Sequence, residues 1–359
     1  MTSDQTGGPF GADERARLTH LLRGLSATDP EIEAALTTGT AGALALEAAV
    51  RRDQPALQPA EAAAVAGLSE DEFAELWRAL GLSAGGAPQR VAPAMVESLP
   101  VLTAAINDWL GEETALGLAR VIGSTTAQLA EAVVDAFRMR YEVPELATGT
   151  TYTEVVARYV ELTRASLPSL EQLISAALEA HLVRVAAGAW APDDDQVSPS
   201  RLLFVGFADL VGYTALSRTL SPGELHRVLS TFEQTVAEAV ARHGGRLVKL
   251  IGDGALYVAD SAAAGCAAAL DICERTADSE LPAVRVGADF GPVISRSGDY
   301  FGEVVNRAAR LVALARPATV VVTDEVAAAL GGGVPVERLP PQALKGFQAP
   351  AVTYRLVGR

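Results

Sequence analysis

The hydrophobic pattern of the chain changes near residue 200, and no other feature of the sequence limits the fold so strongly. From Asp13 to about Ala189, apolar residues recur every three or four positions and Gly or Pro separates the segments, which predicts consecutive helices. Leu202 to Ala208 is instead a short, unbroken apolar run, typical of a strand buried on both faces. We therefore predict an α+β protein in which an all-α region precedes a domain that contains a sheet.

A polar segment separates the two patterns. Residues 191–200 carry two prolines and three aspartates, a composition typical of linkers. We assign residues 1–190 to an all-helical domain, 191–200 to the linker and 201–359 to the second domain. In the first domain the clearest helical segments are 15–25, 60–65, 70–80, 95–110, 125–141 and 152 to about 187.

The second domain has the element order of a ferredoxin-like fold. Ser221, Pro222 and Glu224 form a helix start, with a serine cap, a proline in the first turn and a glutamate three residues after the cap. Asp253 and Gly254 predict a hairpin turn. Further predicted elements are strands at 246–251, 255–259, 283–290, 319–323 and 352–357, and helices from 221 to about 243, at 262–276 and at 304–315. With the first strand they give the order β-α-β-β-α-β with additions.

Charge is distributed unevenly along the chain. Residues 1–195 hold 13 Arg, no Lys and 28 acidic residues, a net charge of −15, whereas residues 196–359 are neutral. An acidic surface repels phosphate backbones and anionic lipid, so we expect neither nucleic acid nor a membrane surface as a partner of the first half. The neutral second half can hold a local basic pocket for an anionic substrate.

The cysteines and the hydropathy indicate the compartment. Cys266 and Cys273 lie seven positions apart in a predicted helix, too far to form a disulfide, and are typical of core thiols in a reduced cytoplasm. No window approaches the roughly 20 uninterrupted apolar residues of a membrane span. We expect a soluble, cytoplasmic protein with no membrane span.

The first candidate site follows the buried strand. Asp209 stands at its carboxyl end and Gly212 follows in a tight turn. A carboxylate there can hold a hard metal ion, and the exposed backbone N–H groups of the turn can meet phosphate oxygens. The alternative is an ordinary turn or cap carboxylate.

Two further groups of polar residues follow. Lys249 lies between apolar neighbours of a predicted strand, where burial is costly without an acceptor, and Asp253 at the hairpin tip can join Asp209 on a metal ion. Asn306 and Arg310 are four apart on one helix and can address one ligand together. The alternatives are an edge lysine, a turn aspartate and solvated helix residues.

With these groups of polar residues in this order along the chain, residues 200–359 resemble the catalytic domain of the class III nucleotidyl cyclases. The resemblance implies that Asp209 and Asp253, with the backbone of Leu210, bind two divalent cations, Mg²⁺ or Mn²⁺. It implies that Lys249 and Asp299 recognise the purine. It further implies transition-state roles for Asn306 and Arg310, and contacts to the remainder of the substrate by Val211, Gly212, Tyr213, Thr214 and Lys345.

The family resemblance also implies a reaction and an assembly. The expected substrate is ATP, which is converted to 3′,5′-cyclic AMP and pyrophosphate. In the family, the metal-binding aspartates and the transition-state residues come from different subunits of a head-to-tail pair. This chain holds both sets, so we expect a homodimer with two active sites. A catalytically silent nucleotide-binding regulator is the alternative.

The helical half is similar to the regulatory domains of soluble actinobacterial cyclases, and this similarity suggests regulation by a proton or a lipid. A dimerisation module without a sensing role is the alternative. His20 and His181 are the only histidines of this half, and the carboxylates Glu112 and Glu113 could titrate if buried. Residues 58–80 resemble a helix-turn-helix and would suggest a DNA-binding regulator, but their acidic character favours a structural hairpin.

Overall fold

The computed structural model describes residues 9–51, 57–83, 91–105, 111–189, 200–347 and 350–358. The chain forms two compact units, Met1–Asp194 and Asp195–Arg359. Of the expected linker, only Ser200 lies within the described residues, and it begins a strand. No helix among the described residues is long and apolar enough to cross a membrane.

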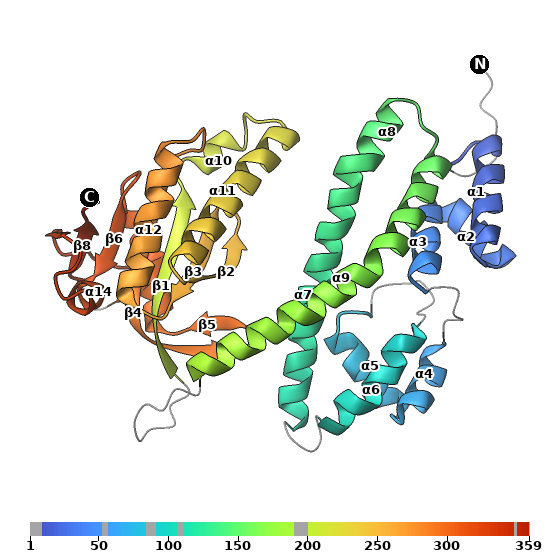
Figure 1. The fold of residues 1–359 in the computed structure, drawn as a ribbon, viewed down its shortest axis with the longest axis horizontal. Helices are drawn as coiled ribbons and strands as arrows, with labels where there is room; N and C mark the ends of the chain where they lie inside the picture. The colour runs from blue at the N-terminus through green and yellow to red at the C-terminus, as the bar shows by residue number, and fades with distance from the viewer. Residues whose placement is uncertain are drawn as a thin grey trace. The chain divides into compact units, whose positions relative to one another are not determined.

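The described part of the first unit consists of helices (Figure 1), with one isolated antiparallel β-bridge between Leu57 and Val91. Two long helices, α7 and α9, pack with shorter ones. The helices are α1 (Ala12–Gly24), α2 (Asp29–Thr38), α3 (Ala41–Arg51), α4 (Pro59–Ala66), α5 (Glu70–Ala79), α6 (Pro93–Ala105), α7 (Glu112–Phe137), α8 (Val143–Ala147) and α9 (Tyr152–Ala189), with a π-helical turn, Arg138–Glu142, between α7 and α8.

Most predicted helices of this unit are present, but α7 begins well before the predicted residue 125. Gly117 and Gly123 interrupt the apolar pattern there. Gly123 is required by packing, since a Cβ at this position would lie 2.3 Å from the carbonyl oxygen of Leu80. The end of the predicted 95–110 helix falls at residues 106–110, outside the described part of the chain.

Helices α4 and α5 form the hairpin expected at residues 58–80. Gly67 ends α4 in the left-handed conformation (φ +70°), and Ser69 caps α5 by accepting a hydrogen bond from Glu72 N. Phe73 and Trp77 are buried and stacked. The exposed residues of α5 include Glu70, Asp71, Glu72 and Glu75, so this surface would repel phosphates rather than bind DNA.

The second unit contains a sheet with the strand order β2-β3-β1-β4-β6-β8-β7, and β5 pairs with β4. The first four strands in this list have the order of a ferredoxin-like sheet, which confirms the predicted β-α-β-β-α-β arrangement. The strands are β1 (Ser200–Leu210), β2 (Arg246–Ile251), β3 (Gly254–Ala259), β4 (Val284–Arg296), β5 (Asp299–Phe301), β6 (Val320–Thr323), β7 (Val336–Arg338) and β8 (Thr353–Leu356).

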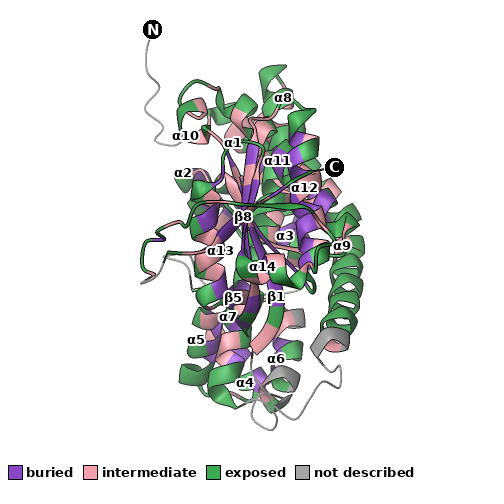
Figure 2. Cartoon of the chain, turned by 90° about the vertical axis from the view of Figure 1, so that its left-hand side faces the viewer, coloured by how far each residue is buried: buried purple, intermediate pink, exposed green. Residues whose placement is uncertain are grey.

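Helices cover both faces of this sheet. On one face α11 (Pro222–Arg242) and α12 (Ala262–Ala277) pack against Phe204 and Ala208 of β1. On the other, α13 (Glu303–Leu314) packs with Leu203 and Val205 of the same strand. Buried residues accordingly concentrate in the strands and in α12 (Figure 2). Since side chains alternate along a strand, Asp209 lies on the face that α13 covers.

The sequence did not predict β5, β7 or the short helices α10 (Tyr213–Leu216) and α14 (Asp324–Ala329). The predicted strand 283–290 also ends before β4 does. The strand continues to Arg296, since β1 pairs with it as far as Ser200 opposite Ile294. Cys266 and Cys273 are free and buried, as expected.

Candidate active site

Two aspartates lie at the end of the sheet where β1 finishes. Asp209 pairs with Gly254 of β3 on one side and with Arg285 of β4 on the other. Asp253 occupies the turn before β3, and its carbonyl oxygen accepts a hydrogen bond from Leu210 N at 3.1 Å. The two residues of the expected metal site are thus carried by neighbouring strand ends.

The residues present suit a hard divalent cation such as the expected Mg²⁺ or Mn²⁺. Asp209 and Asp253 are both partly buried and offer carboxylate oxygens, the ligands that hard cations prefer. Within the described residues there is no group of three or more His, Cys, Asp or Glu side chains that could enclose a metal. The backbone contribution of Leu210 remains a prediction.

Arg285 is a residue of this site that the sequence analysis missed. Its Nε and Nη2 atoms donate to Oδ2 of Asp209 at 2.8 and 2.6 Å. Both bonds reach the same oxygen, so Oδ1 receives no hydrogen bond from this guanidinium. A signal existed in the sequence, because Arg285 interrupts an apolar strand between Val284 and Val286.

Lys249 and Asp299 meet although they are 50 residues apart in the chain. The Lys249 ammonium donates to Oδ2 of Asp299, and Oδ1 of Asp299 accepts from Tyr300 N at 2.9 Å. A second contact joins the same strands: the guanidinium of Arg246 lies 5.3 Å from the Tyr300 ring centroid and also donates to its hydroxyl. The two residues expected to recognise the purine are therefore adjacent in space.

Asn306 and Arg310 lie on the outer side of α13. Val304, Ala308 and Leu311 form the buried stripe of this helix, whereas Asn306 and Arg310 are exposed. Neither side chain has a hydrogen bond or ion pair within the described part of the chain. Both are thus free to contact a second molecule.

Part of the turn after β1 has the backbone geometry expected of a phosphate-binding loop. Gly212 has φ +77°, and it precedes the first turn of α10, where N–H groups lack intrahelical acceptors at Tyr213 and Thr214. Val211 differs, since its N–H already donates to Ala283 O at 2.9 Å. Lys345 lies in an exposed turn and makes no ion pair with another described residue.

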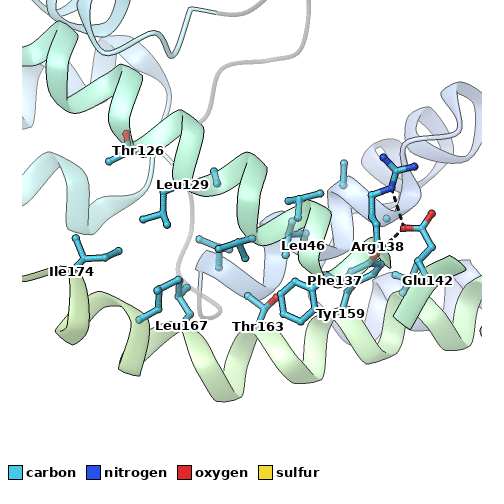
Figure 3. Close-up of a pocket in the computed structure, with 18 of the residues that line it drawn as sticks. Leu46, Thr126, Leu129, Phe137, Arg138, Glu142, Tyr159, Thr163, Leu167 and Ile174 are labelled. Carbon is cyan, nitrogen blue, oxygen red and sulfur yellow. Dashed lines mark hydrogen bonds and ion pairs between the residues drawn. The ribbon is translucent and has the colours of Figure 1, made fainter. Parts of the chain in front are cut away.

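The first unit contains a separate cavity of about 560 Å³ between α3, α7 and α9. Figure 3 shows apolar side chains at one end, including Leu129, Leu167 and Ile174. At the other end Tyr159 donates to Glu142 at 2.6 Å, and Arg138 lies 3.6 Å from the same carboxylate. Burial and this hydrogen bond raise the pKa of Tyr159 well above its usual range, so the phenol stays protonated.

The titratable groups that the sequence analysis considered in this unit are not buried. His20, His181, Glu112 and Glu113 are all exposed. The cavity is not predictable from the local sequence pattern, because its lining comes mainly from three helices distant in the chain.

Comparisons with known proteins point to one family. Residues 197–358 match the model of the adenylate and guanylate cyclase catalytic domain. An adenylate cyclase of Streptomyces coelicolor is 37% identical over 327 residues, which span 90% of this chain and 82% of the relative. An adenylate cyclase of Streptomyces griseus is 37% identical over 285 residues, 79% of this chain and 70% of the relative. The crystal structure of an adenylate/guanylate cyclase/hydrolase from Silicibacter pomeroyi covers 45% of this chain and 98% of its own, with 31% identity and a TM-score of 0.41.

Proposed function

The chain belongs to the adenylate and guanylate cyclase family, and we propose that it converts ATP to cyclic AMP and pyrophosphate at sites shared by two copies of the chain. The observation that carries the substrate assignment is the contact between Lys249 and Asp299. An ammonium donor beside a carboxylate acceptor complements adenine, whose N1 accepts a hydrogen bond and whose exocyclic amine donates one. Guanine presents the reverse pattern at this edge.

Asp209 and Asp253 are the residues that would hold the two divalent cations. When bound, such cations lower the pKa of the ribose 3′-hydroxyl and neutralise the triphosphate. Asp209 retains Oδ1 for this purpose while Arg285 holds Oδ2. Hydrogen bonds to one oxygen of a ligating carboxylate commonly fix its orientation toward a metal.

Arg310 and Asn306 would act on the reacting phosphate and ribose. The guanidinium of Arg310 offers a planar fork of donors for the charge that builds on the α-phosphate oxygens. Asn306, one helical turn earlier on the same face, would orient the ribose. Both are exposed and unpaired within the described residues, which is consistent with a role at an interface with a second copy.

A mixing experiment tests both the catalysis and the dimer. Asp209→Ala and Arg310→Ala should each abolish cyclic AMP formation from ATP with Mn²⁺. Random mixing of the two variants gives one complete site in each heterodimer, so about a quarter of the wild-type activity should return. Asp209→Ala mixed with Asp253→Ala is the matched control and should stay inactive, because both changes affect the same half of the site. Recovery in that control, or activity in the single variants, would contradict the proposal.

For the helical unit we propose regulation by a lipid rather than by a proton. The cavity beside α7 and α9 has a largely apolar lining and a polar end formed by Arg138, Glu142 and Tyr159, as an amphiphilic ligand requires. The π-helical turn Arg138–Glu142 lies at this end, and such turns are frequent at functional sites. His20 and His181 are exposed, and neither lines this cavity.

A further inference from the structure

Helix α13 packs unusually closely on β4. A Cβ at Gly287 would lie 2.0 Å from the backbone nitrogen of Val312, and one at Gly291 would lie 2.9 Å from Cγ2 of Val304. Real side chains do not occupy such positions, so only glycine permits this approach at residue 287. The two contacts fix how far α13 stands from the strand near each of its ends.

Asp289 lies between these glycines on the same face of β4, because side chains alternate along a strand. It is fully buried, with 0% of its surface exposed. Its Oδ1 accepts hydrogen bonds from Thr323 Oγ1 at 2.6 Å and from Phe290 N at 2.8 Å. Its Oδ2 accepts from Nε of Arg307 at 2.7 Å.

Arg307 belongs to α13 and stands between the two residues that face outward. It follows Asn306 directly and precedes Arg310 by three positions. Successive helix residues are rotated by about 100°. An anchor that draws Arg307 toward β4 therefore determines the direction in which Asn306 and Arg310 point.

Among the described residues, Arg307 is the only cation that contacts a cluster of three carboxylates. Its guanidinium lies 3.2 Å from Glu325 and 3.6 Å from Glu303, besides Asp289. Burial alone would lower the pKa of Arg307, but the hydrogen bond and charge of Asp289 outweigh it and the pKa is raised. Burial raises the pKa of Glu325.

We propose that Asp289 is a positioning residue, whose ion pair with Arg307 sets the rotation of α13 and so aims Asn306 and Arg310 at the reacting groups. The proposal rests on the function assigned to those two residues above. An apolar pair could fill this space with similar or greater stability, since buried ion pairs contribute little net free energy. What the ion pair adds is a defined orientation, because hydrogen bonds are directional whereas apolar contacts are not.

Asp289→Asn is the variant of choice, because it keeps the side-chain shape and an oxygen for Thr323 and Phe290. Removal of Arg307 instead would leave several carboxylates without a cation. The expected result is a fall in kcat of about 10- to 100-fold, the cost of a small misplacement of catalytic groups. The KM for ATP should stay near the wild-type value, since Lys249 and Asp299 are not contacted by Asp289.

The matched control is Asp271→Asn. It removes one of the two charged partners of Arg275, which donates to Asp271 at 2.7 Å and to Glu238 at 3.4 Å. Asp271 and Arg275 belong to α12, a helix on the opposite face of the same sheet. This variant should keep the wild-type kcat. Thr323→Val removes one hydrogen-bond donor to Asp289 from outside α13 and should reduce kcat less than Asp289→Asn does. If Asp289→Asn does not fold, the kcat of Thr323→Val tests the positioning role of Asp289.

Mixing separates positioning of α13 from a general loss of structure. Asp289→Asn mixed with Asp209→Ala should recover about a quarter of the wild-type activity, because one site then combines an intact Asp209 with an intact α13. Asp289→Asn mixed with Arg310→Ala should not recover. Recovery with Arg310→Ala but not with Asp209→Ala would overturn the proposal, since it would place the defect on the metal-binding side of the site. An unchanged kcat in folded Asp289→Asn would also overturn it.

The dimer proposal has its own control in the Asp209→Ala and Arg310→Ala mixture. If that mixture stays inactive, the proposal of an active site shared by two subunits is wrong. The kcat and KM of Asp289→Asn then decide the role of Asp289 without the mixing experiment. A normal kcat with a lowered unfolding temperature would then show that the ion pair serves stability alone.

Discussion

The two units of this protein differ in where they place their charged side chains. In the second unit, charged residues from distant parts of the chain pair on one face of the sheet, as Arg285 does with Asp209 and Arg307 with Asp289. In the helical unit, the excess of acidic residues lies mainly at the surface, and the cavity between α3, α7 and α9 has a largely apolar lining. The comparison indicates that removal of a charge should matter most in the second unit, and a change of volume most in the first.

The largest effect is expected for Arg310→Ala. Loss of a guanidinium that stabilises phosphoryl charge should lower kcat by about a thousandfold or more. The unfolding temperature should not change, because Arg310 is exposed and has no ion pair among the described residues. Arg316→Ala, at an exposed arginine just beyond α13, is the control and should retain activity. Equal losses of kcat in Arg310→Ala and Arg316→Ala would contradict a specific catalytic role for the outer face of α13.

A smaller effect, on specificity, is expected for Lys249→Ala. Without the donor to adenine N1, the preference for ATP over GTP should fall by about 10- to 100-fold, as kcat/KM for each nucleotide would show. Lys345→Ala provides the comparison, because a contact to the triphosphate should affect both nucleotides equally. A preserved preference in Lys249→Ala would show that its contact with Asp299 is only structural.

Arg285→Met should change metal binding rather than folding. The guanidinium of Arg285 holds Asp209 through two hydrogen bonds to Oδ2, so its removal should weaken Mn²⁺ binding by about tenfold because the orientation of the carboxylate is lost. Titration of the nucleotide-free protein with Mn²⁺, followed by electron paramagnetic resonance, measures this directly. Arg275→Met, which removes a similar ion pair on α12, should leave the affinity unchanged. Tighter Mn²⁺ binding in Arg285→Met would mean that repulsion between the guanidinium and the cation outweighs the orientation of Asp209.

The smallest effect on turnover is expected in the helical unit. Leu129→Trp should fill part of the cavity and abolish the response of cyclic AMP formation to an added fatty acid, with basal activity retained. Leu182→Trp, at a position on α9 that is 60% exposed and outside the cavity lining, should leave the response intact. A response that survives Leu129→Trp would place the ligand elsewhere and weaken the contrast between the units.

The local pattern of the sequence predicted the elements that carry Asp209, Lys249, Asn306 and Arg310, but not β5, which carries Asp299. Hairpin and capping signals at Asp253 and Ser221 are short-range, and both features are present in the structure. The catalytic candidates were recognisable because each has its motif within a few residues. Lys249 and Asp299 were paired through the family resemblance, and the structure brings them into contact.

The sequence by itself thus determined the all-α and α+β organisation and the positions of the motif residues, because helix period, strand period and turn chemistry act over a few positions. The tertiary structure alone decided the partners of Arg285 and Asp289, and the cavity between α3, α7 and α9. Arg285 and its aspartate are 76 positions apart, and nothing in the residues near either one specifies the other. Such contacts arise only when the sheet register and the packing of helices are set, since those depend on all the side chains of the core together.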